Sequence, residues 1–260
     1  MKIATWNVNS IRVRIDLVKK FLIENDPDII CLQETKSEDD KFPQKPFYDL
    51  GWKYIVIKGQ KSYNGVSIFS KFPINKTKCF DLLNKNDCRH IHANVLGLDI
   101  HNFYVPAGGD IPDRKLNIKF GEKLDFLEKI ENWSTESKLN KSILLGDLNI
   151  APLEQDVWST KQLKNVVSHT DVERKKLLKI LRKGKWVDAI RETHKKDEVL
   201  YSWWSYRAKD WKKSNRGRRL DHIWVSEDLE KKLKNSKIFP KFRGFDRPSD
   251  HVPIMIEIEG

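Results

Sequence analysis

Residues 143–152 read ILLGDLNIAP, a run of apolar residues that leads directly into a carboxylate and an amide. Because side chains alternate between the two faces of an extended chain, Asp147 and Asn149 share one face while Leu148 points back into the core. Polar groups at the carboxyl end of a buried strand mark the place where α/β sheets hold ligands. The alternative is that either residue only caps a turn that Gly146 helps to form.

Other predicted strands also carry polar side chains at one end, either just after an apolar run or, for Asp221 and for Asp250 with His251, at or just before the start of the strand. These strand-end residues are Asn7 and Asn9 in WNVN, Glu34 in LQET, Tyr104 in FYVP, Asp221 in RLDH, and Asp250 and His251 in SDHVP. A sheet that is rich in parallel strands collects such ends along one edge. We therefore expect the six strand ends to build a single site.

Each of these residues also has a purely structural interpretation. The asparagines are common turn residues, Glu34 fits a solvated helix cap, and a lone His251 is more often a satisfied histidine than a catalyst. Asp221 would serve as a buried partner for Arg218 or Arg219. The recurrence of the pattern at six strand ends favours chemistry over these separate explanations.

The combination of side chains points to metal-assisted phosphoryl transfer. Glu34, with amide support from Asn7 or Asn9, suits a hard ion such as Mg²⁺, which takes only one or two protein carboxylates. Zinc is not expected, because the sequence has no cluster of histidines and cysteines. Asp147 and Asn149 together would orient a water molecule and accept its proton.

A histidine with an aspartate behind it would complete this chemistry. Such an aspartate fixes the ring and stabilises the imidazolium, so that a charged His251 holds a phosphate oxygen. A metal ion and a cation that face one phosphate stabilise the charge that grows in the transition state.

The charge of the 260-residue chain predicts a polyanionic partner. It has 49 lysine and arginine residues against 37 aspartate and glutamate residues, which gives a net charge of +12. Such a basic protein favours nucleic acid first and an anionic membrane second. A lysine-rich protein with no charged partner is the remaining alternative.

The cysteines and the amino end predict a cytoplasmic protein without membrane contact. Cys31, Cys79 and Cys88 are odd in number and lack the spacing of a zinc site, so we expect free thiols in a reducing compartment. Residues 1–20 lack the uninterrupted apolar core of a signal peptide. No segment reaches the roughly 20 apolar residues of a membrane span.

The pattern of apolar residues predicts a mixed α/β chain that forms one domain, residues 1–260. Strands are expected at residues 3–8, 29–32, 54–57, 66–70, 92–96, 99–104, 143–145, 220–225 and 252–258, and helices at residues 12–24, 118–133, 172–181 and 228–235. The opening strand, helix and strand favour parallel pairing through a right-handed crossover. A second such unit, which ends at Asp147, hints at a duplicated half.

Residues 201–221, YSWWSYRAKDWKKSNRGRRLD, interleave aromatic and basic side chains. Arginine and lysine grip phosphates, and aromatic rings line pockets for a sugar or a displaced base. The alternative, that the tryptophans are core residues of a strand, is favoured for Trp204. Arg207, Lys212 and Lys213 are expected on the surface.

The motifs NVN, LQETK, YVPAGG, GDLNIAP, NRGRRLD and SDHVP together resemble the exonuclease III family of abasic-site (AP) endonucleases, within the endonuclease/exonuclease/phosphatase superfamily. They span nearly the whole chain in the order of the family. The resemblance implies an α/β four-layer sandwich, in which two mixed β-sheets pack face to face with helices on the outside. The active site would lie at one edge, between the sheets.

The same resemblance implies an activity and its partners. It implies a Mg²⁺-dependent enzyme, with Mn²⁺ as a substitute ion, that cuts duplex DNA on the 5′ side of abasic sites. A monomer is expected from the sequence itself, which shows no exposed heptad or large apolar patch. Many members also trim 3′ blocking groups and digest duplex DNA from its 3′ ends.

Individual residues receive roles from this resemblance. The implied metal-site residues are Glu34, Asn7 and Asp250, of which Glu34 is the ligand with Asn7 nearby. The implied catalytic residues are Tyr104, Asp147, Asn149, Asp221 and His251, with Asp147 as general base and His251 paired to Asp221. The implied substrate-binding residues are Asn9, Trp203, Arg207, Asn215, Arg218 and Leu220.

The sequence departs from the family pattern at three places. Ser10 stands where many relatives have glycine, and YVPAGGD lacks a basic or long polar residue just after its proline. Arg218 replaces an aromatic or aliphatic residue that, in the family, helps Trp203 and Leu220 to form the pocket for the abasic sugar. The shape of that pocket and the balance of endonuclease to exonuclease activity are therefore open.

Two other functions remain as alternatives. A phosphoinositide or sphingomyelin-type phosphodiesterase of the same superfamily would share the predicted catalytic residues. A catalytically inactive DNA-binding relative would keep the fold alone. The charge of +12 opposes the first alternative, and the complete set of chemical side chains opposes the second.

Overall fold

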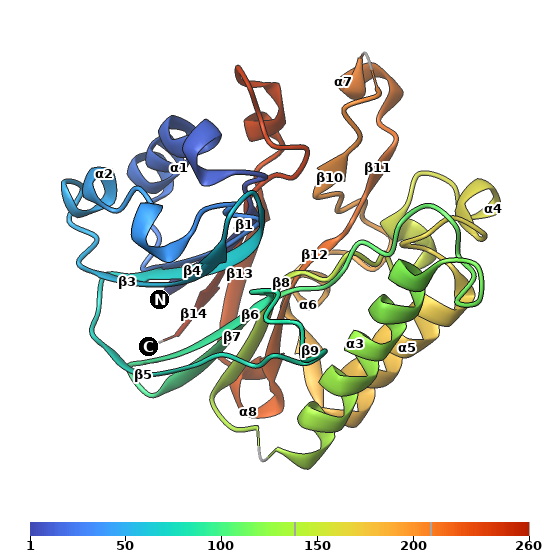
Figure 1. Cartoon of the computed structure of the whole chain (residues 1–260), viewed down its shortest axis with the longest axis horizontal. Helices are drawn as coiled ribbons and strands as arrows, with labels where there is room; N and C mark the ends of the chain where they lie inside the picture. The colour runs from blue at the N-terminus through green and yellow to red at the C-terminus, as the bar shows by residue number, and fades with distance from the viewer. Residues whose placement is uncertain (138, 209, 260) are drawn as a thin grey trace.

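Two six-stranded β-sheets form the centre of the molecule, as the computed structural model shows for residues 1–137, 139–208 and 210–259 (Figure 1). The first sheet contains, in spatial order, β13 (Leu233–Ile238), β14 (Ile254–Ile258), β1 (Lys2–Asn7), β2 (Ile29–Gln33), β4 (Tyr63–Ser70) and β3 (Tyr54–Gln60). The second contains β5 (Ile74–Lys78), β6 (His90–Val95), β7 (Leu98–Tyr104), β8 (Ser142–Asp147), β12 (Asp221–Ser226) and β9 (Trp186–Asp188).

The two sheets repeat one arrangement of strands. In each sheet the central pair is parallel and is connected by a helix: β1 and β2 through α1 (Ile11–Asn25), β7 and β8 through α3 (Ile118–Glu136). The flanking pairs are antiparallel in both sheets. The two predicted strand–helix–strand units are therefore confirmed, and they occupy equivalent places in the two sheets.

The strands at the centre are buried on both faces, which explains their continuous apolar runs. In β2, Ile29 and Cys31 belong to the core between the sheets, whereas Ile30 and Leu32 belong to the core beneath the outer helices. Residues 143–145 of β8 alternate in the same way between the inner and outer cores. Figure 1 shows α1 outside the first sheet, and α3 and α5 (Asp171–Lys183) outside the second. The predicted four-layer sandwich is confirmed.

Two of the longer helices, α3 and α5, begin at recognisable capping residues. Asn117 caps α3 by accepting a hydrogen bond from the Lys119 N–H. Thr170 and Glu173 form a reciprocal capping box at the start of α5. The short elements are α2 (Lys45–Tyr48), α4 (Thr160–Leu163), α6 (Ala189–Glu192), α7 (Trp211–Ser214), α8 (Glu227–Glu230), the 3₁₀ turns at Asp39–Lys41, Glu154–Asp156 and Pro240–Gly244, and the two-stranded ribbon of β10 (Trp203–Trp204) and β11 (Gly217–Arg218).

The predicted helix at residues 228–235 is wrong. The helix α8 ends at Glu230, and the chain from Leu233 continues as the edge strand β13, which pairs with β14. The segment EDLEKKLKN is rich in good helix formers, but pairing along the sheet overrides that preference. Exposed Lys234 and Lys237 protect this edge from pairing with other chains.

Two further expectations can be compared with the structure. Cys31, Cys79 and Cys88 are all free thiols, as predicted. Within the described residues, no helix has both the length and the apolar character needed to cross a membrane.

Candidate active site

A cleft of about 1110 Å³ opens where the predicted strand ends meet. Its wall includes many of the predicted site residues: Glu34, Tyr104, Asn149, Trp203, Arg207, Arg218, Leu220, Asp250 and His251. Asp147 and Asp221 are fully buried directly behind it.

The register of the second sheet places three of these side chains in one row. Tyr104 ends β7 opposite Asp147 on β8, and Asp147 in turn lies opposite Asp221, the first residue of β12. Opposed residues on neighbouring strands share a face of the sheet. The phenol and the two carboxylates are therefore positioned by backbone pairing rather than by flexible loops.

The first sheet contributes Asn7 and Glu34 to the same place. The Asn7 amide nitrogen donates to Glu34 Oε1 at 2.9 Å and to Asp147 Oδ2 at 2.8 Å. Its oxygen accepts the Asn9 backbone N–H at 3.0 Å, and this contact sets the orientation of the amide. Asn7 thus connects the carboxylates of the two sheets, and its own oxygen is already engaged.

Three residues just beyond the strand ends adopt left-handed backbone conformations. Their φ angles are 44° at Asn9, 50° at Glu34 and 54° at Asn149. Each such conformation costs about 1–3 kcal/mol and typically persists where a site requires it. Asp147 Oδ1 accepts the Asn149 N–H at 2.9 Å, so the turn that was the structural alternative is present together with the shared face.

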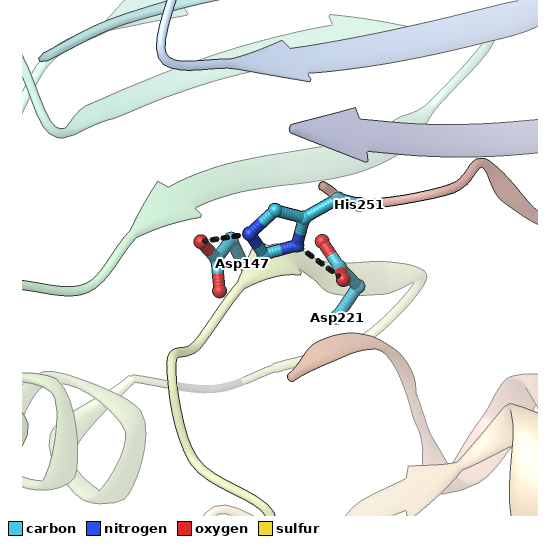
Figure 2. A group of neighbouring side chains, drawn as sticks. All are labelled: Asp147, Asp221 and His251. Atoms are coloured by element: carbon cyan, nitrogen blue, oxygen red, sulfur yellow. Dashed lines mark hydrogen bonds and ion pairs between the residues drawn. The ribbon is translucent and has the colours of Figure 1, made fainter. Parts of the chain in front are cut away.

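His251 lies between two aspartates, as Figure 2 shows. Its Nδ1 is 2.8 Å from Asp221 Oδ2, and its Nε2 is 3.6 Å from Asp147 Oδ2. The Ser202 hydroxyl donates to the same Asp221 oxygen at 2.6 Å. The predicted Asp221–His251 pair is thus present in the structure. Ser202 is thus a further contact of this pair, and it belongs to none of the sequence motifs that predicted the site.

Burial and charge set the protonation of these groups. Burial, with the nearby Asp221 carboxylate, raises the pKa of Asp147 to about 7, although the neighbouring His251 lowers it. Burial alone would lower the pKa of His251, but the carboxylates of Asp221 and Asp147 outweigh it and raise that pKa to about 10. At neutral pH the site therefore holds an imidazolium beside a carboxyl group that titrates near neutrality.

Tyr104 and Glu34 are shifted in opposite directions. Burial, reinforced by the charges of Glu34 and Asp147, raises the pKa of the Tyr104 phenol well above its ordinary value, so this group is a neutral O–H donor. Burial favours the neutral form of Glu34, yet the Lys36 ammonium and the Asn7 amide together lower its pKa. Lys36 Nζ lies 2.9 Å from Glu34 Oε2. Glu34 is thus an ionised carboxylate that already attracts a cation.

The chain has been compared with known proteins. Residues 4–251 match the Endonuclease/Exonuclease/phosphatase family. The chain is 32% identical to an exodeoxyribonuclease of Bacillus subtilis over 99% of each protein. This chain belongs to the Endonuclease/Exonuclease/phosphatase family.

Solved structures of the family agree with this assignment. An AP endonuclease from Archaeoglobus fulgidus superposes with a TM-score of 0.93 at 35% identity, and the 3′ phosphatase NExo from Neisseria, bound to a product DNA hairpin, with a TM-score of 0.89 at 33% identity. Both comparisons cover 100% of this chain and 100% of the other. The predicted resemblance to the exonuclease III type of AP endonuclease is confirmed.

Asp250 organises one rim of the cleft. Its Oδ1 accepts a hydrogen bond from the Asn9 amide at 3.2 Å, and its Oδ2 accepts one from the Trp203 indole N–H at 2.9 Å. The Asn9 oxygen also accepts from Lys36 Nζ at 2.6 Å. Asp250 therefore joins the predicted metal side of the site to the aromatic wall of the cleft.

The basic and aromatic segment lies partly inside the cleft and partly outside it. Trp203 lines the cleft and Arg207 is exposed at its edge, whereas Trp204 is buried, as favoured from the sequence. The structure does not bring Asn215 into the cleft, because its side chain accepts a hydrogen bond from the Trp204 indole at 3.0 Å and lines a separate pocket of about 460 Å³. Cleft residues that the sequence analysis did not single out include Trp158 and Arg216.

Proposed function

We propose that this chain is a DNA-repair phosphodiesterase that incises duplex DNA on the 5′ side of abasic sites and also processes 3′ ends. The observation that carries the proposal is the buried Asp147–His251–Asp221 group beside Asn149, at the foot of a cleft lined by tryptophans and cations. The named activities of the exodeoxyribonuclease, AP endonuclease and 3′ phosphatase relatives support the same chemistry.

Asp147 is the group that we assign to the attacking water. Its pKa of about 7 leaves a large fraction ionised at neutral pH, which suits a general base. The Asn149 amide nitrogen donates to Asp147 Oδ2 at 3.1 Å, and Asn7 donates to the same oxygen. These two amides hold the carboxylate still, and Asn149 faces the cleft where a water molecule would be oriented.

His251 and Tyr104 are the groups that we assign to the phosphate. The imidazolium of His251, held by Asp221, presents positive charge to non-bridging oxygens as negative charge develops on them. Tyr104 keeps its proton at all relevant pH values and so donates a hydrogen bond to a phosphate or leaving-group oxygen. Both side chains line the cleft.

The oxygen-rich side of the site fits a hard divalent cation. Glu34 is ionised and reaches the cleft, and the neighbouring Lys36 ammonium marks it as a place where positive charge is stable. The group of Asp147, Asp221 and His251 has closely spaced ligand atoms, but its imidazole already faces a carboxylate with each nitrogen, so we assign the ion to Glu34 instead. We propose Mg²⁺, with Mn²⁺ as a substitute. When bound, the ion would neutralise charge on the phosphate.

Duplex DNA with an abasic site or a 3′ end is the partner that we propose. The net charge of +12 and the cationic cleft residues Arg207, Lys213 and Arg216 support a polyanionic substrate. We further propose that the protein acts as a monomer in the cytoplasm, where its free cysteines remain reduced.

Cleavage of a labelled duplex that carries one stable abasic analogue tests this function. It would be run beside an undamaged duplex with a recessed 3′ end, each with Mg²⁺ or with EDTA. We expect Mg²⁺-dependent incision at the abasic position and slower digestion from the 3′ end. No cleavage of either duplex by folded protein in Mg²⁺ would contradict the proposal and favour a lipid-headgroup phosphodiesterase.

A further inference from the structure

Arg218 is a partly buried cation in the wall of the cleft. Its Nη1 donates to the Val167 carbonyl at 3.1 Å and to the Ser168 hydroxyl at 2.6 Å. Its guanidinium carbon lies 5.2 Å from the centre of the Trp203 ring. These contacts fix the side chain in place, but all of the partners are neutral, so they leave its charge uncompensated.

No carboxylate in the described part of the chain forms an ion pair with Arg218. Glu173 is the carboxylate whose charge acts on it, but Glu173 lies 2.6 Å from the Lys123 ammonium and accepts hydrogen bonds from Thr170 and Ser168. Burial accordingly lowers the pKa of Arg218. Because an unpaired buried charge is costly, a cation kept in such a place favours an anion as its ligand.

The backbone places Arg218 in line with the catalytic histidine. Trp203 pairs with Arg218 on one side and with His251 on the other. Directly opposed residues project from the same face, so the imidazole, the indole and the guanidinium form a row across three adjacent segments. With neighbouring strands about 4.8 Å apart, the backbones of Arg218 and His251 are roughly 10 Å apart. The guanidinium is therefore placed for a different phosphate from the one that His251 faces.

We propose that Arg218 binds a phosphate adjacent to the scissile one, with the intervening sugar against Trp203. This inference rests on the proposed function and deepens it. Both hydrogen bonds of Arg218 to described residues use Nη1. The edge formed by Nε and Nη2 is therefore free to bind two oxygens of one phosphate in the planar, bidentate geometry that arginine favours. The substrate class is thus a nucleic-acid strand with a charged phosphate next to the one that is cleaved.

Neutralising one phosphate at a time tests this contact. The probe is a duplex with one stable abasic analogue, in which single phosphates flanking the scissile position are replaced by neutral methylphosphonates. Binding is measured by fluorescence anisotropy in the Asp147→Asn background, so that no cleavage intervenes. We expect a loss of about 10-fold at one adjacent position, which is the scale of a charge-assisted hydrogen bond.

The same series with Arg218→Met added assigns the contact to this residue. The double variant should bind the unmodified duplex about 10-fold more weakly and show no further loss at the sensitive position, because the two changes remove one interaction. Arg218→Lys should keep part of that sensitivity. Arg182→Met is the matched control: this exposed arginine lies on the outer helix α5, away from the cleft, and its replacement should leave both the affinity and the positional pattern unchanged.

Three outcomes would overturn the inference. A sensitive position that persists after Arg218→Met would assign the phosphate contact to another group. Tighter binding after Arg218→Met would show that the side chain obstructs the cleft instead. Both outcomes leave the proposed function intact, whereas failure of folded Asp147→Asn protein to bind any of the duplexes would overturn the proposed function as well.

Discussion

At the scale of single residues, one turn geometry is used twice in the site. Asn7 and Asp147 end central strands of the two sheets, β1 and β8, and each accepts the N–H of an asparagine two positions further along, Asn9 and Asn149. The difference is chemical, because one turn begins with an amide and the other with a carboxylate. This exchange allows Asn7 to donate to Asp147 and to Glu34 at once, where two carboxylates in the same positions would repel each other.

The environment of each residue decides its role more than its type does. Asp147, Asp156 and Asp221 are all fully buried aspartates. Asp156 faces Arg219 and Arg191, which outweigh its burial and lower its pKa to about 2, so it is a permanent anion within an ion network. Burial instead raises the pKa of Asp147 to about 7, because its neighbours are mostly amides and other acids. Of Asp147 and Asp156, Asp147 is therefore the one suited to gain and lose a proton near neutral pH.

At the scale of secondary-structure elements, a buried ion pair connects the outer helices to the site. Lys123 on α3 and Glu173 on α5 are 2.6 Å apart and both fully buried. The Lys123 ammonium also donates to the carbonyls of Asn149 at 2.8 Å and Ala107 at 3.2 Å. One ammonium thus joins both helices to two loops, the one that carries Asn149 and the one that follows Tyr104.

Lys123→Met should therefore lower both the free energy of unfolding and the rate of turnover. Removal of one partner leaves the Glu173 carboxylate buried and unpaired, and we expect a loss of about 3–5 kcal/mol in the free energy of unfolding. The value is measured by urea denaturation of the wild type, Lys123→Met, Glu173→Leu and the double variant. The double variant should recover much of the loss, and purely additive effects would show that the two side chains do not act as a pair.

At the scale of the whole molecule, the buried histidines predict sensitivity to acid. Burial lowers the pKa of His90 well below its usual value, that of His101 to about 3 and that of His222 to about 4. Below about pH 6.5 these three histidines become protonated in the unfolded chain but stay neutral in the folded chain. The free energy of unfolding therefore falls as the pH falls. Asp147 opposes this by one proton, because its raised pKa lets the folded state keep a proton that the unfolded state releases.

The net difference of about two protons gives a slope of roughly 3 kcal/mol per pH unit between about pH 6 and pH 4. Urea denaturation at a series of pH values measures it. His101→Gln should remove about one of the two protons that this slope represents, whatever the effect of the substitution on the free energy of unfolding at a single pH. A slope near zero over this range would contradict the assignment of these histidines as neutral in the folded state.

How far the sequence predicts the molecule depends on the range of the interactions involved. The alternation of side chains along a strand is local, so the shared face of Asp147 and Asn149 and the strand–helix–strand units could be predicted. The contacts of Ser202 with Asp221 and of Lys123 with Asn149 join residues that are distant in sequence and belong to no motif. The helix predicted at residues 228–235 is wrong for a related reason, because the structure of the edge strand β13 depends on pairing with β14.

Asp147 is the residue that we propose activates the water that attacks the phosphate. The most direct measurement is the single-turnover rate of incision of an abasic duplex by Asp147→Asn, together with its binding affinity for the same duplex. The substitution keeps the shape of the side chain and removes the proton acceptor, so we predict unimpaired binding and a rate at least about 100-fold lower. A rate close to that of the wild type would contradict the account and place the general base elsewhere.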